Sequence, residues 1–316
     1  MSVFLVTGGA GFIGSNIVEN LLKKGEQVRV LDSFVTGRRD NLTPFLDHIS
    51  LTEGDIRDRD AVRKALNGAD FVLHQAALGS ISRSLADPLE TNSCNVDGTL
   101  NLLIESKACG IKRFVYASSS SVYGNSQEMC KVETMTPNPC SPYGVSKLVG
   151  EMYCRVFYEI YGLETVILRY FNVFGRRQDP DSQYAAVIPR FITALQNSKA
   201  PVIYGDGNQT RDFTFVENVV QANMKACLPG FALFGEAFNI ACGDQTSVND
   251  LHGILSALIG KDIQPVHVEG RKGEVKHSYA NIEKARSILG YAPQFDLKSG
   301  LEQTVSWYEI SGASLR

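Results

Sequence analysis

A tyrosine and a lysine four residues apart indicate possible acid–base chemistry in this sequence. Tyr143 and Lys147 lie in the stretch SPYGVSK, and residues with this spacing share one face of a helix. A free tyrosine ionises near pH 10, so a phenolate base at neutral pH needs a neighbouring cation, which Lys147 can supply. The pair alone is a weak signal, because this spacing often arises by chance on surface helices.

A run of four serines offers hydroxyl groups for the same chemistry. The stretch YASSSSVYG covers residues 116–124, between an apolar segment and a turn. Parallel sheets bind their ligands in the crevice beyond the carboxyl ends of the strands. A serine at the end of this strand would therefore face a site, whereas a low-complexity patch without chemistry is the alternative from these residues alone.

Glycines near the start of the chain predict a dinucleotide-binding turn. TGGAGFIG places Gly8, Gly11 and Gly14 directly after a predicted strand and at the start of a helix. Such glycines let the backbone turn tightly and approach a pyrophosphate, which binds the N–H groups of the helix start. Asp32 ends the next predicted strand, where a carboxylate binds both ribose hydroxyls and repels a 2′-phosphate. This favours NAD over NADP, although the basic pair that begins at Arg38 keeps NADP open.

The elements that must position these residues alternate between strand and helix. The patterns predict strands at 3–8, 27–32, 49–55, 70–76, 113–119 and 164–175, with helices at 12–24, 58–67, 88–108 and 141–161. This alternation predicts an α/β fold with a Rossmann-type doubly wound parallel sheet and a smaller α/β substrate-binding domain. We expect residues 1–173 plus about 215–244 to form the NAD-binding domain, and about 174–214 plus 245–316 to form the nucleotide-sugar-binding domain.

Composition narrows the class of protein. The chain has 316 residues, 44% hydrophobic, with a formal net charge of −3, which gives no electrostatic reason to expect nucleic acid or an anionic membrane. Its seven cysteines form no C-x-x-C pair, so we expect neither a disulfide framework nor a metal site. No signal peptide or membrane-spanning stretch is evident. We therefore expect a cytoplasmic protein.

Four motifs together resemble the extended short-chain dehydrogenase/reductase family and, more narrowly, its nucleotide-sugar 4-epimerases. They are TGGAGFIG, the serine-rich strand end before VYG, SPYGVSK and RYFNVFG. The resemblance implies that Ser119 is the catalytic serine, Tyr143 the base and Lys147 its activator. It also implies a tightly bound, recycled NAD, which takes the hydride from C4 of a UDP-sugar and returns it to the other face of a 4-keto intermediate.

The resemblance further implies which residues bind the two ligands. The cofactor would contact Gly8, Gly11, Phe12, Ile13, Gly14, Asp32, Ser33, Asp55, Ile56, Gln75, Ala76, Ala77, Asn95, Tyr143, Lys147 and Tyr170. The substrate would contact Gly79, Ser80, Arg83, Ser119, Ser120, Ser121, Tyr143, Asn172, Val187, Tyr204, Arg211, Arg271, Glu274 and Ser278. Arginines suit a diphosphate because they form charge-assisted forks. For Asp55, the residues alone leave a helix cap as the alternative to an adenine contact.

The same resemblance favours one reaction among relatives that share the opening oxidation. A 4,6-dehydratase has an acid–base pair of carboxylates before the VYG turn and a UDP-glucuronate decarboxylase has a glutamate, whereas Ser120 and Ser121 stand there in this chain. Ser278 corresponds to a gatekeeper position, where a small residue leaves volume for a 2-N-acetyl group. We therefore expect UDP-GlcNAc/UDP-GalNAc interconversion, with UDP-Glc/UDP-Gal as a possible second activity. A UDP-glucose 4-epimerase proper, a decarboxylase, a dehydratase, and a non-catalytic NAD-binding sensor or scaffold remain alternatives.

The family resemblance also implies a homodimer built from two helices of each subunit. The candidates are 88–108 and 141–161, and the second carries the apolar stripe Val145, Leu148, Met152, Val156 and Ile160. From the sequence alone, that stripe could equally be the face that packs on the sheet.

Overall fold

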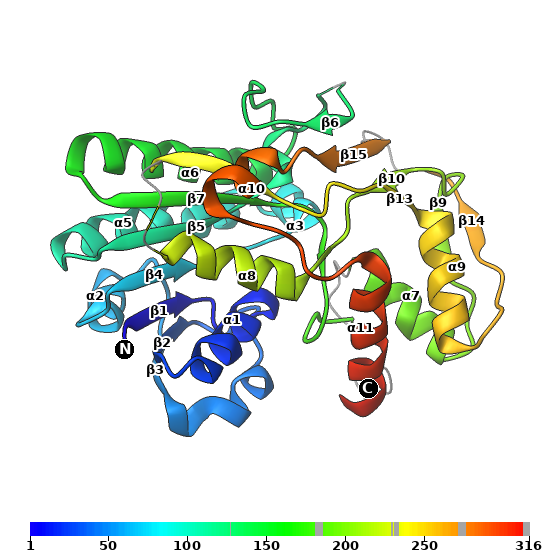
Figure 1. Ribbon diagram of the computed structural model, residues 1–316, viewed down its shortest axis with the longest axis horizontal. Helices are drawn as coiled ribbons and strands as arrows, with labels where there is room; N and C mark the ends of the chain where they lie inside the picture. Colours follow the sequence, from blue (N-terminus) through cyan, green and yellow to red (C-terminus); the bar gives the residue numbers. More distant parts are fainter. Residues whose placement is uncertain (127, 181–185, 229, 231–233, 271–275, 312–316) are drawn as a thin grey trace.

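A seven-stranded parallel sheet forms the centre of the computed structural model, which describes residues 1–126, 128–180, 186–228, 230, 234–270 and 276–311 (Figure 1). The strand order is β12-β7-β5-β4-β1-β2-β3. In chain order these strands are β1 (Val3–Thr7), β2 (Gln27–Asp32), β3 (Ile49–Glu53), β4 (Phe71–His74), β5 (Arg113–Ser119), β7 (Glu164–Tyr170) and β12 (Glu236–Ile240). The strands are short and rich in apolar residues because both faces of the sheet are covered.

Helices cover both faces of this sheet, as a doubly wound fold requires. One core layer contains buried residues of α1 (Phe12–Lys23), α8 (Val216–Cys227) and α10 (Glu283–Leu289). The other contains buried residues of α2 (Arg59–Leu66), α5 (Gly98–Ala108) and α6 (Pro142–Tyr161). The expected Rossmann-type architecture is therefore confirmed. Within the described ranges, no helix combines the length and apolarity needed to span a membrane.

A third apolar core lies beyond the carboxyl ends of the strands, among α7 (Val187–Gln196), α9 (Val248–Ile259) and α11 (Leu297–Ser311) (Figure 1). Beside it lies a small sheet of order β13-β10-β15-β6. Its strands are β13 (Thr246–Ser247), β10 (Thr210–Arg211), β15 (His277–Ala280) and β6 (Cys130–Lys131). Two further pairs join β8 (Val173–Phe174) to β11 (Thr214–Phe215), and β9 (Val202–Tyr204) to β14 (Val266–Val268).

The segment around α10 packs in a different core from the one that the sequence-based domain division implies. Ile282, Leu289 and Tyr291 were expected in the smaller domain, but they are buried in the same core layer as α1 and α8. We propose that the chain divides as expected, except that the segment around α10 belongs with the large sheet. Its apolar residues reach that core only because the chain returns to it late in the sequence.

Two predicted elements are interrupted, and both interruptions lie beside the site. The helix expected at 88–108 consists of α4 (Pro88–Asn92), a π-helical turn (Ser93–Asp97) and α5. The strand expected at 164–175 ends at Tyr170, and Asn172 adopts a φ of 30° before β8 begins. Single π-helical turns are common at functional sites because they redirect side chains. The remaining short elements are α3 (Ile81–Ala86) and the 3-10 turns Arg39–Asn41, Thr43–His48 and Ser120–Val122.

Candidate active site

The glycine turn packs so closely that side chains are excluded from it. A Cβ on Gly14 would lie 2.1 Å from the carbonyl oxygen of Gly8, and a Cβ on Gly8 would lie 2.7 Å from the Cα of Ala76. Gly8 also has a φ of 67°, which disfavours other residues. At the start of α1, Gly11 caps the helix without a side-chain hydrogen bond. The first N–H groups of this helix are thus available to an anion such as a pyrophosphate.

Asp32 is fixed at the end of β2, where the sequence placed it. Its Oδ2 accepts a hydrogen bond from the N–H of Ala10 at 2.8 Å, and its Oδ1 accepts one from the N–H of Phe34 at 2.8 Å. Burial raises the pKa of this carboxyl, and the two hydrogen bonds oppose the shift. Arg38, which kept NADP open, forms an ion pair with Asp179 at 3.3 Å. This geometry fits a ribose with free hydroxyls better than a 2′-phosphate.

Asp55 does not cap a helix, which was one of its two expected roles. It lies after the end of β3 at Glu53, and the cap of α2 is Asp58, whose side chain accepts hydrogen bonds from backbone N–H groups. The alternative of a helix cap at Asp55 is therefore wrong. Its carboxylate instead receives two hydrogen bonds from the guanidinium of Arg57, at 3.0 and 2.7 Å, and the resulting hydrogen bonding lowers its pKa. Contact with adenine stays a prediction.

The three expected catalytic residues come together at the carboxyl end of β5. Tyr143 lies in the first turn of α6, and Lys147 lies one turn later with its ammonium 6.0 Å from the centroid of the Tyr143 ring. Lys147 donates a hydrogen bond to the carbonyl of Ala117 at 2.7 Å. The hydroxyl of Ser119 donates to that of Ser121 at 3.1 Å, and its closeness to the phenol lowers the pKa of Tyr143.

Burial opposes the charged forms of both members of the pair. It raises the pKa of Tyr143, an effect that the nearby hydroxyl of Ser119 offsets in part. It lowers the pKa of Lys147 to about 8. The lysine alone therefore does not make a phenolate at neutral pH in this arrangement, and a further cation beside the phenol is needed.

A cavity of about 440 Å³ runs from the glycine turn to the catalytic pair. It is lined by most of the expected cofactor residues and by four expected substrate residues, of which Tyr143 is expected to contact both ligands. These are Gly8, Gly11, Phe12, Ile13, Gly14, Asp32, Ser33, Asp55, Ile56, Gln75, Ala76, Ala77, Tyr143, Lys147 and Tyr170, with Gly79, Ser80 and Arg83. The tight glycine turn at one end of the cavity and the carboxylate of Asp32 in its lining fit a dinucleotide.

A second cavity of about 390 Å³ lies next to the first and shares Ala186 with it. Its lining includes the expected substrate residues Asn172, Val187, Tyr204 and Arg211. The guanidinium of Arg211 donates to the carbonyl of Thr210 at 2.8 Å. Apolar side chains of α7 and β9 complete the wall, which suits a base ring.

Some expected site residues do not line either cavity. Asn95 is buried, and its side chain accepts from the N–H of Leu78 at 2.8 Å and donates to Ser146 at 3.0 Å. It holds the cavity wall from behind, so a direct cofactor contact is not what this geometry provides. Ser119, Ser120, Ser121 and Ser278 also lie off the cavity linings, and Arg271 and Glu274 fall outside the described residues.

The structure adds residues to the cavity that the motifs did not reveal. Ser118 lines it, although the sequence pointed to the three serines that follow. Arg177 lines it with a φ of 66° and donates to Glu19 at 2.6 Å. Successive residues of a strand point to opposite faces, so alternation along β5 could have distinguished Ser118 from Ser119. No local pattern marks Arg177, because its position depends on its contact with Glu19 of α1.

Comparison with known proteins agrees with this geometry. Residues 4–241 match the family model described as NAD dependent epimerase/dehydratase family. A UDP-glucose 4-epimerase of Mycolicibacterium smegmatis is 35% identical, over 96% of this chain and 97% of the relative.

Solved structures are equally similar over their whole length. A UDP-N-acetylglucosamine 4-epimerase from Methanobrevibacter ruminantium, in complex with UDP-N-acetylmuramic acid, has a TM-score of 0.93 and 40% identity, covering 98% of this chain and 99% of that one. A UDP-glucuronic acid 4-epimerase from Bacillus cereus, in complex with UDP-glucuronic acid and NAD, has a TM-score of 0.90 and 33% identity, covering 98% of this chain and 99% of that one. The chain belongs to the NAD dependent epimerase/dehydratase family and is an NAD-dependent isomerase of the epimerase type.

Proposed function

We propose that this protein interconverts UDP-sugars that differ in configuration at C4, most readily UDP-GlcNAc and UDP-GalNAc, with UDP-Glc and UDP-Gal as a second pair. The observation that carries the reaction is that Tyr143 and Lys147 line one end of a cavity whose other end is the glycine turn, with Ser119 beside Tyr143 at the end of β5. A proton acceptor thus stands at the place where the fold presents a dinucleotide.

Tyr143, Ser119 and Lys147 have separate roles in the proposed proton transfer. Tyr143 accepts the proton of the sugar 4-hydroxyl and later returns it, while Ser119 hydrogen-bonds the same oxygen. Bound NAD supplies a hydride acceptor and, in its oxidised form, a cationic ring. Lys147 places a positive charge on the same helix face as the phenol, and oxidised NAD would add a second when bound, so both charges would favour the phenolate that burial disfavours.

Two features support epimerisation over dehydration, which the family also includes. Ser120 and Ser121 stand at the turn where an eliminating enzyme would need a carboxylic acid and its base. The carboxylates that line the first cavity are Asp32, Asp55, Glu90 and Asp179. Asp32 ends β2, Asp55 follows β3, Glu90 lies on α4 and Asp179 follows β8, so none of them belongs to the turn of Ser120 and Ser121.

Residues that could bind the nucleotide sugar lie in the second cavity and on the small sheet beside it. Arg211 and Asn172 in the second cavity offer a guanidinium and an amide for a nucleotide diphosphate. Ser278 lies on β15 directly opposite Arg211 of β10. A small side chain there leaves volume beside the sugar for an acetamido group, and the relative from M. ruminantium is a UDP-N-acetylglucosamine 4-epimerase.

Proton NMR of the purified protein with UDP-GlcNAc and with UDP-Glc, without added cofactor, tests this proposal. We expect the anomeric signals of the 4-epimer to appear with both sugars, or with the acetylated sugar alone. In Ser278→Tyr, conversion of UDP-GlcNAc is expected to fall at least about a hundredfold while that of UDP-Glc persists, because a bulky ring excludes the acetamido group. Equal losses for both sugars would remove Ser278 as the gate, and no conversion even with added NAD would reject the epimerase.

We further propose that the protein is a homodimer. The stripe on α6 faces outward: Met152 is 61% and Ile160 70% exposed, and Val145 and Val156 are also exposed, whereas Leu148 packs inward. On the neighbouring α4, which contacts α6, Leu89 is 83% exposed. An apolar face of this kind on adjacent helices is typical of a subunit interface.

Met152→Glu is expected to convert the dimer to a monomer. A two-fold interface would bury two unpaired carboxylates, so the dimer dissociation constant should rise at least about a hundredfold. Sedimentation velocity measures this, with Met129→Glu as the control, because Met129 is 54% exposed near β6 and away from the stripe. A monomeric parent protein, or a Met152→Glu dimer of unchanged affinity, would contradict the proposal.

A further inference from the structure

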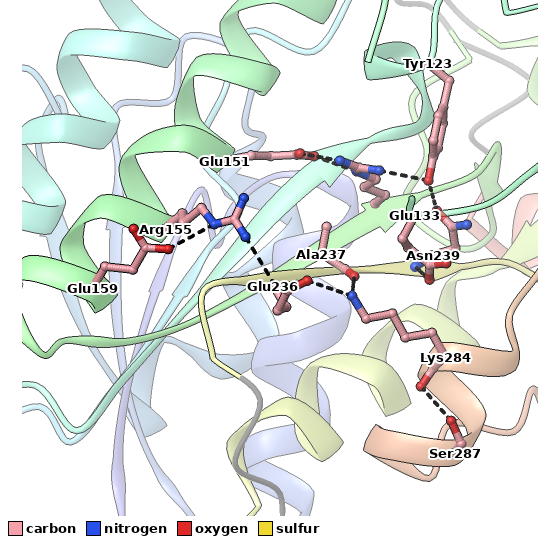
Figure 2. A network of polar contacts seen from close by, with 11 residues as sticks. Tyr123, Glu133, Glu151, Arg155, Glu159, Glu236, Ala237, Asn239, Lys284 and Ser287 are labelled. Carbon is pink, nitrogen blue, oxygen red and sulfur yellow. Dashed lines mark hydrogen bonds and ion pairs between the residues drawn. The ribbon is translucent and has the colours of Figure 1, made fainter. Parts of the chain in front are cut away.

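A buried ion pair lies next to the catalytic pair on α6. Glu151 lies one helical turn after Lys147 and on the same face. Two hydrogen bonds from Arg169 on β7 reach its carboxylate, Nε to Oε1 at 2.9 Å and Nη2 to Oε2 at 2.6 Å. The two side chains are only 7% and 5% exposed, in contrast to the pair of Arg155 and Glu159 on the same helix, 60% and 57% exposed. Figure 2 shows both Glu151 and the Arg155–Glu159 pair.

This pair holds the strand end that carries the catalytic serine. The hydroxyl of Ser118 donates to Oε1 of Glu151 at 2.5 Å, and Ser118 is the register partner of Arg169 across β5 and β7. Ser118 immediately precedes Ser119, so the backbone from which Ser119 projects is fixed. A third donor of Arg169, Nη1, reaches the hydroxyl of Tyr123 just after the serine turn at 2.9 Å.

The network continues into the small sheet beside the second cavity. Tyr123 donates to Oδ1 of Asn239 at 2.6 Å (Figure 2). The Asn239 amide donates to the backbone carbonyls of Lys131 and Asn281 at 3.0 and 3.1 Å. Those carbonyls lie at the ends of β6 and β15. The pair therefore connects the helix of the base, the strand of the serine and the sheet that carries Ser278.

Glu151 also acts electrostatically on Lys147. Burial lowers the pKa of Lys147 to about 8, and the negative charge of Glu151 opposes that shift. The other titratable groups around this ammonium are Cys94, Cys154, Tyr116, Tyr143 and His74. Burial raises the pKa of the thiols and phenols and lowers the pKa of His74 to about 3, so these groups are uncharged near pH 7. Besides Lys147, the groups that face Glu151 are Ser118, Arg169, Cys154 and Tyr116.

We propose that Glu151, held by Arg169, is a positioning residue of the reaction: it keeps the ammonium of Lys147 charged and fixes the strand end that presents Ser119. Neither member of the pair lines the cavities, so both act through other side chains. The inference rests on the proposed epimerase activity for its kinetic readout, and on NAD binding for an independent one.

Glu151→Gln is the primary test, with the pH dependence of kcat as its readout. Loss of the negative charge lowers the pKa of Lys147 further, so the ammonium is lost at lower pH and the alkaline limb of kcat should move to lower pH. Because Lys147 lines the cofactor cavity, the pH above which NAD binds more weakly should move in the same direction. We also expect kcat at the optimum to fall about tenfold with little change in KM, as reacting groups lose their alignment.

Glu159→Gln is the matched control, since it removes a carboxylate from the same helix in an exposed pair and should leave both pH profiles in place. An alkaline limb that stays in place in Glu151→Gln, for kcat and for NAD affinity alike, would overturn the electrostatic role. If the parent protein converts no sugar, the proposed function fails, and the NAD profile alone decides the role of Glu151.

Ser118→Ala carries the test if Glu151→Gln does not fold, because it leaves the ion pair intact and removes one hydrogen bond to it. We expect kcat to fall about tenfold, with the alkaline limb unmoved because the charge of Glu151 remains. An unchanged kcat in this variant would show that the network does not position the strand end, and would overturn the inference.

Discussion

Tyr143→Phe is expected to lower turnover of UDP-sugars about a thousandfold, with NAD still bound. The change removes one hydroxyl, and a positioned acid–base group typically contributes a factor of this order. The ring itself remains to fill its place between Lys147 and Ser119, so the cavity should keep its shape. Proton NMR measures the turnover, and chromatography of the cofactor released by denaturation measures the bound NAD.

Tyr153→Phe provides the control for this result. Tyr153 lies on the same helix and packs, partly buried, on the other core layer, so the same chemical change should leave turnover within about twofold of the parent. Unchanged turnover in Tyr143→Phe would remove Tyr143 as the base. Loss of NAD together with activity would show instead that the variant had damaged the cofactor site.

Gly14→Ala is expected to abolish stable NAD binding and to weaken the fold. The added Cβ would lie 2.1 Å from the carbonyl oxygen of Gly8 and 2.9 Å from the Cα of Gly9, and both neighbours are backbone. The start of α1 must therefore move away from the turn, which removes the N–H groups from the pyrophosphate site. Overpacking of this kind lowers the free energy of unfolding by about 1–3 kcal/mol. Urea unfolding and the NAD content of the purified protein measure the two effects.

Gly253→Ala is the matched control for the glycine turn. Gly253 lies within α9, and a Cβ there would meet no atom within 4 Å. Alanine favours a helix over glycine by about 1 kcal/mol, so this variant should be as stable as the parent or slightly more so, with NAD retained. A Gly14→Ala protein that keeps both its NAD and its stability would show that the turn relaxes without cost, contrary to its packing.

Local sequence patterns predicted the elements whose formation depends on neighbouring residues. The glycine spacing, the apolar strands and the 3.6-residue period predicted β1, α1, β2 and α6 within a residue or two, because turns, strands and helices depend on neighbouring residues. Asp32 and the Tyr143–Lys147 pair followed from the ends and faces of those same elements. Alternation of strand and helix then left a doubly wound parallel sheet as the natural arrangement.

Features that depend on contacts between distant segments could not be predicted from local sequence patterns. The π-helical turn that interrupts the helix after Asn92 leaves no periodic signature, and the cap at Asp58 rather than Asp55 depends on where β3 ends. The burial of the α10 segment against α1 and α8 depends on how the late part of the chain returns to the large sheet. Secondary-structure propensities do not predict such packing, because it depends on contacts among several elements.

The sequence by itself thus determined the chemistry this protein offers: a dinucleotide turn, a carboxylate for a ribose, and a tyrosine with its lysine on one helical face. Only the tertiary structure decided how that chemistry is supported. Glu151 and Arg169 stand on different elements of the chain and meet only when α6 packs on the sheet. A buried ion pair forms only where folding removes both charges from water and places them within hydrogen-bond distance, so its presence and its effect on Lys147 belong to the folded molecule.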